Sequence, residues 1–200
     1  MNTLLLSTTY CGPVQWYQKL YRSQAVEIEQ WETFQKQTYR NRCLIATTGG
    51  VLPLSIPIEH GDSMLMRDIR ISDHGNWRRL HWNALQSAYG ESPFFEYYQD
   101  DFRPFYEQRW TYLIDFNEAI RRVVCQLIDF EPQVSLSADF RKPGGPDDYR
   151  YTITPKHQQA EPDATFKPYY QVYRQKHGFL PNLSILDLLF NMGPESIYYL

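Results

Sequence analysis

The sequence predicts an α/β fold with a mostly parallel sheet that opens with a strand-helix-strand unit, an added β-hairpin, and helices packed around it. Three observations predict this class. Two short apolar runs flank an amphipathic stretch near the start, a Gly-Gly pair separates two further strand-like runs, and later stretches have helical spacing. A length of 200 residues with 42% hydrophobic content suits one domain over 1–200.

The opening unit consists of a strand, a loop, a helix and a second strand. Thr3–Ser7 is an apolar run typical of a buried strand. The loop Thr8–Pro13 ends in Gly-Pro, and Val14–Tyr21 then has apolar residues at helical spacing. Ala25–Glu29 alternates apolar and acidic residues, which predicts the second strand. This order of elements predicts a parallel pair.

A hairpin is predicted next, because Cys43–Thr47 and Val51–Ile58 flank Gly49-Gly50. The two prolines of the second arm limit it to an edge or broken strand. Met66–Ser72 alternates apolar and polar residues only roughly and suggests a further strand.

The following region is predicted to be mainly helical. Ser92-Pro93 has the form of a cap followed by a first-turn proline, which predicts a short aromatic helix through Tyr98. One long helix is predicted over Pro104–Ile128, and a last strand over Gln133–Ala138. A helix over Asn76–Tyr89 has one apolar face, formed by Trp77, Leu80, Ala84, Leu85 and Ala88.

The end of the chain is predicted to be a polar loop followed by a docked helix. Residues 141–165 are rich in Pro, Gly, Asp and Gln, so we expect a long, partly mobile loop. Ser184–Asn191 is an apolar helix in which Ser184 and Asp187 resemble a capping box, and Gly193-Pro194 ends it.

Composition excludes several classes of protein. The net charge of -3 and the pI near 5.9 argue against a nucleic-acid partner. Cys11, Cys43 and Cys125 lack metal-ligand spacing, so we interpret them as free thiols in a reducing compartment. No apolar run approaches the roughly 20 residues of a membrane span, so a cytoplasmic protein is expected. The common phosphate-loop, dinucleotide, hydrolase and zinc-peptidase motifs are absent, and no cofactor or metal is predicted.

A cationic segment between two predicted strands is the first candidate binding site. Lys36, Arg40, Asn41 and Arg42 concentrate three cations and an amide in an otherwise acidic chain. Guanidinium forks bind phosphate or carboxylate bidentately, which predicts an anion site. The alternative is a solvated loop that forms salt bridges with the nearby glutamates.

The second candidate is the approach to the Asn76–Tyr89 helix, where Arg67 and Arg70 precede Asp73 and His74. Backbone amides at a helix start attract anions. Asp73 could orient His74 as an acid or base near neutral pH, although a capping role for Asp73 or Asn76 competes. His81 lies on the apolar face and is interpreted as a hydrogen-bonded core histidine.

Two further places offer reactive or polar side chains. Cys11 lies between a strand and a helix, where the helix dipole would lower its thiol pKa, and the competing interpretation is a small turn residue. In the tail, Asp187 is interpreted as a structural capper. Lys176, His177 and Asn182 have no evident structural role in the sequence and remain site candidates, with His177 and Asn182 expected to close the binding site from the tail.

Four blocks together resemble the WbqC-like protein family: Thr9–Tyr17, Gln37–Arg42, Trp77–Tyr89 and Leu183–Glu195. The family is associated with bacterial O-antigen and surface-polysaccharide gene clusters. The resemblance implies a role in transferring an amino-acid group, such as glycine, to a sugar. It supplies no catalytic residues.

Two hypotheses of function follow. The first is a cytoplasmic transferase that acts on a sugar nucleotide or an aminoacyl donor, binds an anionic small molecule through Arg40, Arg42, Arg67 and Arg70, and uses His74 as general base. The second is a non-catalytic binding or assembly protein with an aromatic-rich surface for a partner or a second copy, because Tyr is abundant. Convergence of these side chains on one pocket would favour the first hypothesis.

Overall fold

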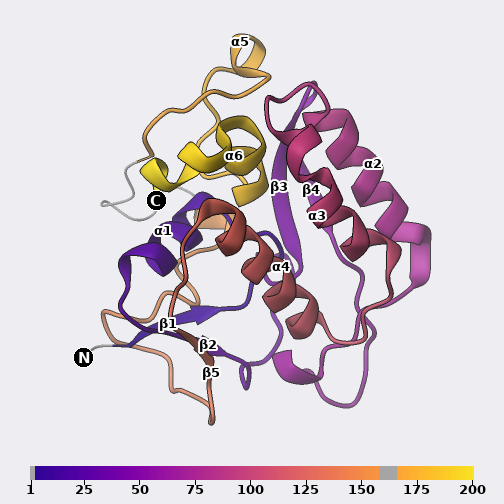
Figure 1. The fold of residues 1–200 in the computed structure, drawn as a ribbon. Coiled ribbons are helices and arrows are strands. Elements are labelled where there is room, and N and C mark those ends of the chain that lie inside the picture. The colour runs from indigo at the N-terminus through magenta and orange to yellow at the C-terminus, as the bar shows by residue number, and fades with distance from the viewer. Residues whose placement is uncertain (1–2, 158–165) are drawn as a thin grey trace.

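The computed structural model describes residues 3–157 and 166–200 and confirms the mixed α/β class. Three strands, β1 (Leu4–Ser7), β2 (Val26–Glu29) and β5 (Val134–Leu136), form a parallel sheet in the order β1-β2-β5. The helix α1 (Val14–Arg22) connects β1 to β2, as the strand-helix-strand pattern predicts. Figure 1 shows this sheet at the lower end of the molecule.

The predicted hairpin is also confirmed. β3 (Arg42–Thr47) and β4 (Gly50–Ser55) form a separate antiparallel pair. Gly50 has a φ of 104° at the turn, a conformation that glycine adopts without strain. Because the second sheet has two strands within the described residues, Pro53 lies on an edge strand, where a missing N–H is tolerated.

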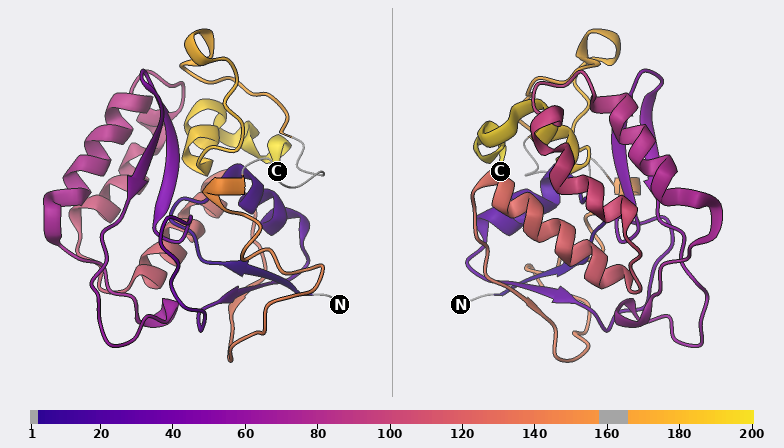
Figure 2. Two further views of the ribbon diagram at one scale, coloured as in Figure 1. Left: turned by 180° about the vertical axis from the view of Figure 1, so that it is seen from behind. Right: turned by 45° about the vertical axis from the view of Figure 1, so that its right-hand side comes forward.

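Five more helices complete the described fold: α2 (Trp77–Tyr89), α3 (Phe95–Glu107), α4 (Leu113–Ile128), α5 (Arg174–His177) and α6 (Ile185–Met192). The strand β3 contacts both α2 and α6, and Figures 1 and 2 show the hairpin running alongside α2. No helix in the described ranges has both the length and the apolar character needed to cross a membrane.

The single long helix over Pro104–Ile128 is wrong, because α3 and α4 are separate helices. Pro104 lies in the last turn of α3, which is also longer than the predicted aromatic helix. Residues 111–113 instead pair with residues 69–71, where Ile71 N–H donates to Thr111 and Leu113 N–H donates to Ile69. These long-range backbone bonds replace the helical ones and separate the two helices.

Two smaller expectations are also wrong. Met66–Ser72 is not a strand, because Met66–Asp68 forms a 3-10 turn whose Met66 N–H donates to the Glu32 carbonyl, and only isolated bridges follow it. In α2 the predicted apolar face includes Leu80, which is 61% exposed. The buried face passes through Trp77, His81, Leu85 and Ala88 instead.

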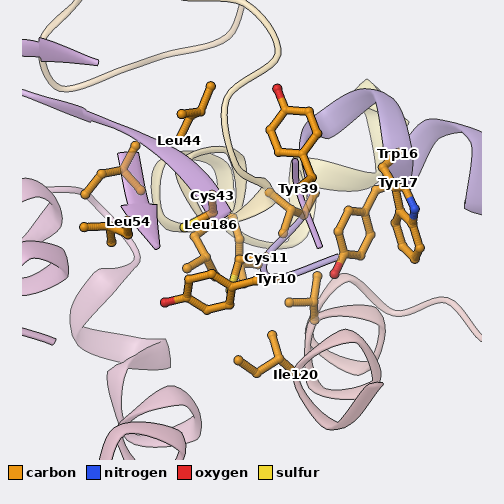
Figure 3. Close-up of a cluster of buried hydrophobic side chains, with 14 of the residues drawn as sticks. Tyr10, Cys11, Trp16, Tyr17, Tyr39, Cys43, Leu44, Leu54, Ile120 and Leu186 are labelled. Carbon is orange, nitrogen blue, oxygen red and sulfur yellow. The ribbon is translucent and has the colours of Figure 1, made fainter. Parts of the chain in front are cut away.

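The C-terminal tail is docked, as predicted. Val14 N–H donates to the Leu183 carbonyl, Ile185 N–H donates to the Gly12 carbonyl, and Ser184 N–H donates to Leu44. The helix α6 therefore lies against the loop after β1 and against β3, and it also contacts α1, α2, α3 and α4. Its side chains share one apolar cluster with Tyr10, Cys11 and Cys43 (Figure 3).

The Pro/Gly-rich loop is partly buried. Arg150 and Ile153 are buried, and Arg150 forms ion pairs with Glu29 and Asp148. The nearby Glu32 accepts two hydrogen bonds from Arg40, whose guanidinium lies 3.4 Å from the Arg150 carbonyl. These ion pairs therefore hold this part of the loop in place, although the loop has few apolar side chains to bury. The predicted loop continues over 158–165, outside the described residues.

Candidate functional site

An arginine-lined cleft lies between the start of α2 and the end of α3. It has a volume of about 350 Å³ and is called the arginine cleft below. Its lining residues are Asn76, Arg78, Arg79, Trp82, Tyr106, Glu107 and Arg109.

The local sequence explains how the cleft opens. Gly75 has a φ of 81° and Asn76 a φ of 51°, so the chain reverses direction immediately before α2. Glycine and asparagine adopt this left-handed conformation more readily than other residues. The first turn of α2 then presents Arg78 and Arg79, while α3 ends after Glu107 and places Arg109 opposite them.

Positive charge in the cleft is only partly neutralised. Asp73 is hydrogen-bonded to Arg78 and lies 3.5 Å from Arg109, and the hydrogen bond from Arg78 lowers the pKa of this carboxyl. Glu107 is paired with Arg103 outside the cleft lining. Arg79 has no ion-pair partner within the described ranges, and the buried Nε of Arg78 has no hydrogen-bond partner there.

Two aromatic rings form the inner wall. The ring centroids of Trp82 and Tyr106 are 5.6 Å apart. The Tyr106 hydroxyl lies 2.9 Å from that of Tyr10, which lies 3.0 Å from Nδ1 of His81. His81 is therefore a buried, hydrogen-bonded histidine, as predicted, and burial lowers its pKa to about 4. The wall combines a flat apolar surface with a buried polar chain behind it.

Cys11 lies near this buried chain but is not an activated thiol. Burial raises the pKa of the Cys11 thiol well above its ordinary value, so the structure favours the interpretation of Cys11 as a turn residue over that of an activated thiol. The residue is fully buried, with a φ of 44° in the loop after β1. A thiolate is the nucleophilic form of cysteine, and this environment disfavours it.

Of the predicted site residues, Asp73 and His74 lie beside the arginine cleft. Both are exposed and precede Asn76 in the chain. The Asp73 carboxylate binds Arg78 and Arg109, and in the described structure no hydrogen bond joins it to His74. Asp73 thus positions guanidinium groups rather than the imidazole.

The segment from Lys36 to Arg42 does not line the cleft. Lys36 is exposed, whereas Arg40 is 1% exposed and fully engaged with Glu32. The Asn41 side chain donates to the Ile56 carbonyl, and Arg42 Nε donates to Ser55. The salt-bridge alternative therefore holds for Arg40, whose charge is already neutralised.

Arg67 and Arg70 are exposed and have partners of their own. The Arg67 guanidinium lies 4.1 Å from the Trp31 ring centroid, and Arg70 lies 3.4 Å from Glu59. Neither residue lines the arginine cleft.

The predicted site residues of the C-terminal tail form hydrogen bonds with backbone groups of the hairpin and of α1. His177 Nε2 lies 3.1 Å from the Thr47 carbonyl, and Lys176 donates to Thr48. Asn182 is 2% exposed and bonds both the backbone N–H and the side chain of Gln15. None of these three residues lines the arginine cleft.

Asp187 is not a helix cap, because its carboxylate accepts hydrogen bonds from Tyr89, Tyr169 and Gln171. The helix-capping side chain is Ser184, which accepts from the Leu186 N–H.

The lining arginines were missed by reasoning from the sequence, although a signal was present. Arg78 and Arg79 occupy the first turn of α2, which contains no acidic residue. Cations are unfavourable there, because the helix dipole is positive at its start. A pair of arginines at a helix start therefore indicates a function other than helix stability.

The arrangement can bind an anion beside a flat ring. Guanidinium forks hold phosphate or carboxylate oxygens, and Trp82 offers a surface on which a base or sugar can pack. The described residues contain no cluster of three or more His, Cys, Asp or Glu that could hold a metal ion.

Comparisons with known proteins agree with the resemblance of the four sequence blocks. The model of the WbqC-like protein family matches residues 9–161 and 143–199. An uncharacterised protein of Mycobacterium tuberculosis, Rv1507c, is 26% identical over 193 residues, which cover 84% of this chain and 83% of that protein. No solved structure gives a significant match. The family match extends over most of the chain, and the protein therefore belongs to the WbqC-like protein family.

Proposed function

We propose that this protein is a transferase of bacterial surface-polysaccharide biosynthesis that binds a sugar nucleotide or an aminoacyl donor in the arginine cleft. The observation that carries the proposal is the set of three arginines around Trp82 and Tyr106, with Arg79 lacking an ion-pair partner in the described structure. A sugar nucleotide contains phosphate groups next to rings, and an aminoacyl phosphate or adenylate contains a phosphate group. The chain belongs to the WbqC-like protein family, and the resemblance to that family implies transfer of an amino-acid group to a sugar.

The proposed reaction needs a base and a stabilised leaving group. His74 takes the proton of an acceptor hydroxyl, whose oxygen forms a bond to the electrophilic carbon of the donor. The bond between that carbon and a phosphate oxygen breaks. The departing phosphate keeps the electron pair, and Arg78, Arg79 and Arg109 stabilise its charge. Asp73 holds two of these guanidinium groups in place.

Calorimetric titration of the protein with nucleotide sugars and aminoacyl phosphate analogues tests the binding step. We expect Arg79→Ala to weaken binding about tenfold or more, because a charge-assisted hydrogen bond to phosphate is lost. Arg174→Ala is the matched control, since Arg174 is exposed on α5 and does not line the cleft. Equal affinity of both variants would remove the cleft as the donor site.

Turnover tests the catalytic step separately. His74→Ala should retain donor binding and reduce turnover by about 10²–10⁴-fold, as the loss of a general base does. A variant with unchanged turnover would leave the cleft as a binding site without His74 catalysis.

A further inference from the structure

The two edges of the parallel sheet differ. The outer edge of β1 is covered by the Pro/Gly-rich loop, because Leu5 N–H donates to the Asp147 carbonyl and Tyr149 N–H donates to the Leu5 carbonyl. β5 is the terminal strand on the other side, and within the described ranges no strand or bridge pairs with its outer edge. One edge is therefore closed within the chain and the other is open.

The register identifies which backbone groups of β5 face outward. The Gln133 carbonyl accepts from the Val26 N–H, and the Ser137 N–H donates to the Ile28 carbonyl. Alternate residues of a parallel strand bond the same neighbour, so Ser135 also bonds β2. The N–H and C=O groups of Val134 and Leu136 consequently point away from the sheet.

Features that block edge pairing are missing from β5. The strand contains no charged residue and no proline, and Leu136 is 43% exposed. Phe140, shortly after the strand, is 50% exposed. Natural sheet edges that remain unpaired are usually protected by charge, proline or a covering segment.

A groove of about 380 Å³ runs between this edge and the exposed face of α4. Val134, Ser135 and Leu136 line it together with Asp115 and Arg122 of α4. A second hollow of about 680 Å³ continues past Arg122 toward the end of α4.

Among the described residues, the unpaired charges of the groove, Asp115 and Arg122, are self-complementary, because the other two charged lining residues, Glu118 and Arg121, pair with each other. Asp115 and Arg122 are both exposed and seven residues apart, so they lie on one face of α4. In the described structure neither has an ion-pair partner. If two copies of α4 lie antiparallel about a two-fold axis, Asp115 of each copy faces Arg122 of the other.

We propose that the open edge of β5 and the exposed face of α4 bind a second copy of this chain in a symmetric dimer. Val134 of one copy pairs with Leu136 of the other, and each such antiparallel pair exchanges two backbone hydrogen bonds. The two sheets become continuous. A two-fold axis requires a self-complementary surface, which the Asp115 and Arg122 pair supplies.

Light scattering coupled to gel filtration tests this dimer with the full chain. The wild type is expected at twice the chain mass of 23.8 kDa. Leu136→Lys should give a monomer, because it places a charge on the apolar edge. Tyr97→Lys is the matched control, since Tyr97 is 75% exposed on α3 and lies outside the groove, and it should remain dimeric.

Reversing the charges of Asp115 and Arg122 tests whether a dimer forms through this interface rather than through another surface. Asp115→Arg alone and Arg122→Asp alone should each give a monomer, because like charges then face each other across the axis. The double variant, with both changes, should restore the dimer. A monomeric wild type, or single reversals that remain dimeric, would overturn the proposal. Ligand titration in the arginine cleft is a separate measurement, so either proposal can fail without the other.

Discussion

His81 gives the molecule a stability that depends on pH. Its imidazole is 6% exposed, and burial lowers its pKa from 6.5 to about 4, while a hydrogen bond with the Ser55 backbone opposes this shift. Between these values the unfolded chain binds a proton that the folded chain does not. Stability therefore rises with pH across this window, by about 3 kcal/mol in total.

Urea unfolding at several pH values between 4 and 6.5 measures this contribution. The difference in unfolding free energy between the wild type and His81→Asn should increase with pH over that range. His60→Asn is the control for replacement of an exposed histidine. A difference that does not change with pH for His81→Asn would contradict a lowered pKa of His81 in the folded state.

Asp187 is also buried, but there burial favours the protonated form of the side chain, whereas at His81 it favours the deprotonated form. Burial raises the pKa of its carboxyl above 3.8, although hydrogen bonds from Tyr169, Gln171 and Tyr89 lower it again. Between 3.8 and the raised value the folded chain holds the proton that the unfolded chain releases, so this group destabilises the fold as pH rises. Several donors around one carboxylate limit that effect.

Sequence reasoning identified His81 but misplaced Asp187, for a physical reason. The position of His81 on the apolar face of α2 follows from helical spacing within a few residues. Two donors to Asp187, Tyr89 and Tyr169, lie 98 and 18 residues away in the chain. Local spacing cannot indicate such partners. The arginine cleft likewise joins residues that are distant in the chain, because Arg109 follows α3 whereas Arg78 and Arg79 belong to α2.

At the scale of elements, Ser184 joins the last helix to the loop after β1. Its hydroxyl accepts a hydrogen bond from the Leu186 N–H and donates one to the Cys11 carbonyl. Ser184→Ala removes both the helix cap and the contact with the loop. We expect a loss of about 1–2 kcal/mol in unfolding free energy, the upper range for a cap residue.

Urea unfolding compares this variant with Ser63→Ala. Ser63 is exposed and its hydroxyl bonds Asp68, so its replacement should change stability by less than about 0.5 kcal/mol. Equal effects of both substitutions would mean that the cap of α6 does not hold the tail.

Elements with local signals were predictable from the sequence. Gly49-Gly50 placed the hairpin, and Ser184 placed the start of α6 within one residue. The break between α3 and α4 was not predictable, because residues 111–113 leave the helical conformation to pair with residues 69–71. The apolar spacing of Trp110, Leu113 and Ile114 predicted a continuous helix there, and tertiary backbone bonds overrode that local pattern.

For the whole molecule, buried ion pairs close the carboxyl end of the parallel sheet. Ligands of α/β proteins commonly bind at this end. Here Glu29 is the last residue of β2 and forms an ion pair with Arg150. Glu32, three residues further along the chain, forms an ion pair with Arg40. The protein's own side chains therefore fill the usual ligand position. The arginine cleft, by contrast, lies outside the parallel sheet and has accessible cationic groups.

Through its ion pairs, Arg150 anchors the loop over 141–157 to the parallel sheet. Arg150→Met would leave the Glu29 carboxylate, which is 0% exposed, without its cation. Removal of one partner of a buried ion pair costs about 3–5 kcal/mol, because the remaining charge is uncompensated. We expect a loss of this size in urea unfolding and faster proteolytic cleavage within the loop.

A second substitution separates the charge effect from packing. Glu29→Gln in the Arg150→Met background removes the uncompensated charge, so the double variant should be more stable than Arg150→Met alone. Arg174→Ala, on the exposed face of α5, should leave both measurements unchanged. If Glu29→Gln restored nothing, loss of the Arg150 side-chain volume rather than its charge would explain the destabilisation. The Pro/Gly-rich loop would then be held by packing against the carboxyl end of the sheet.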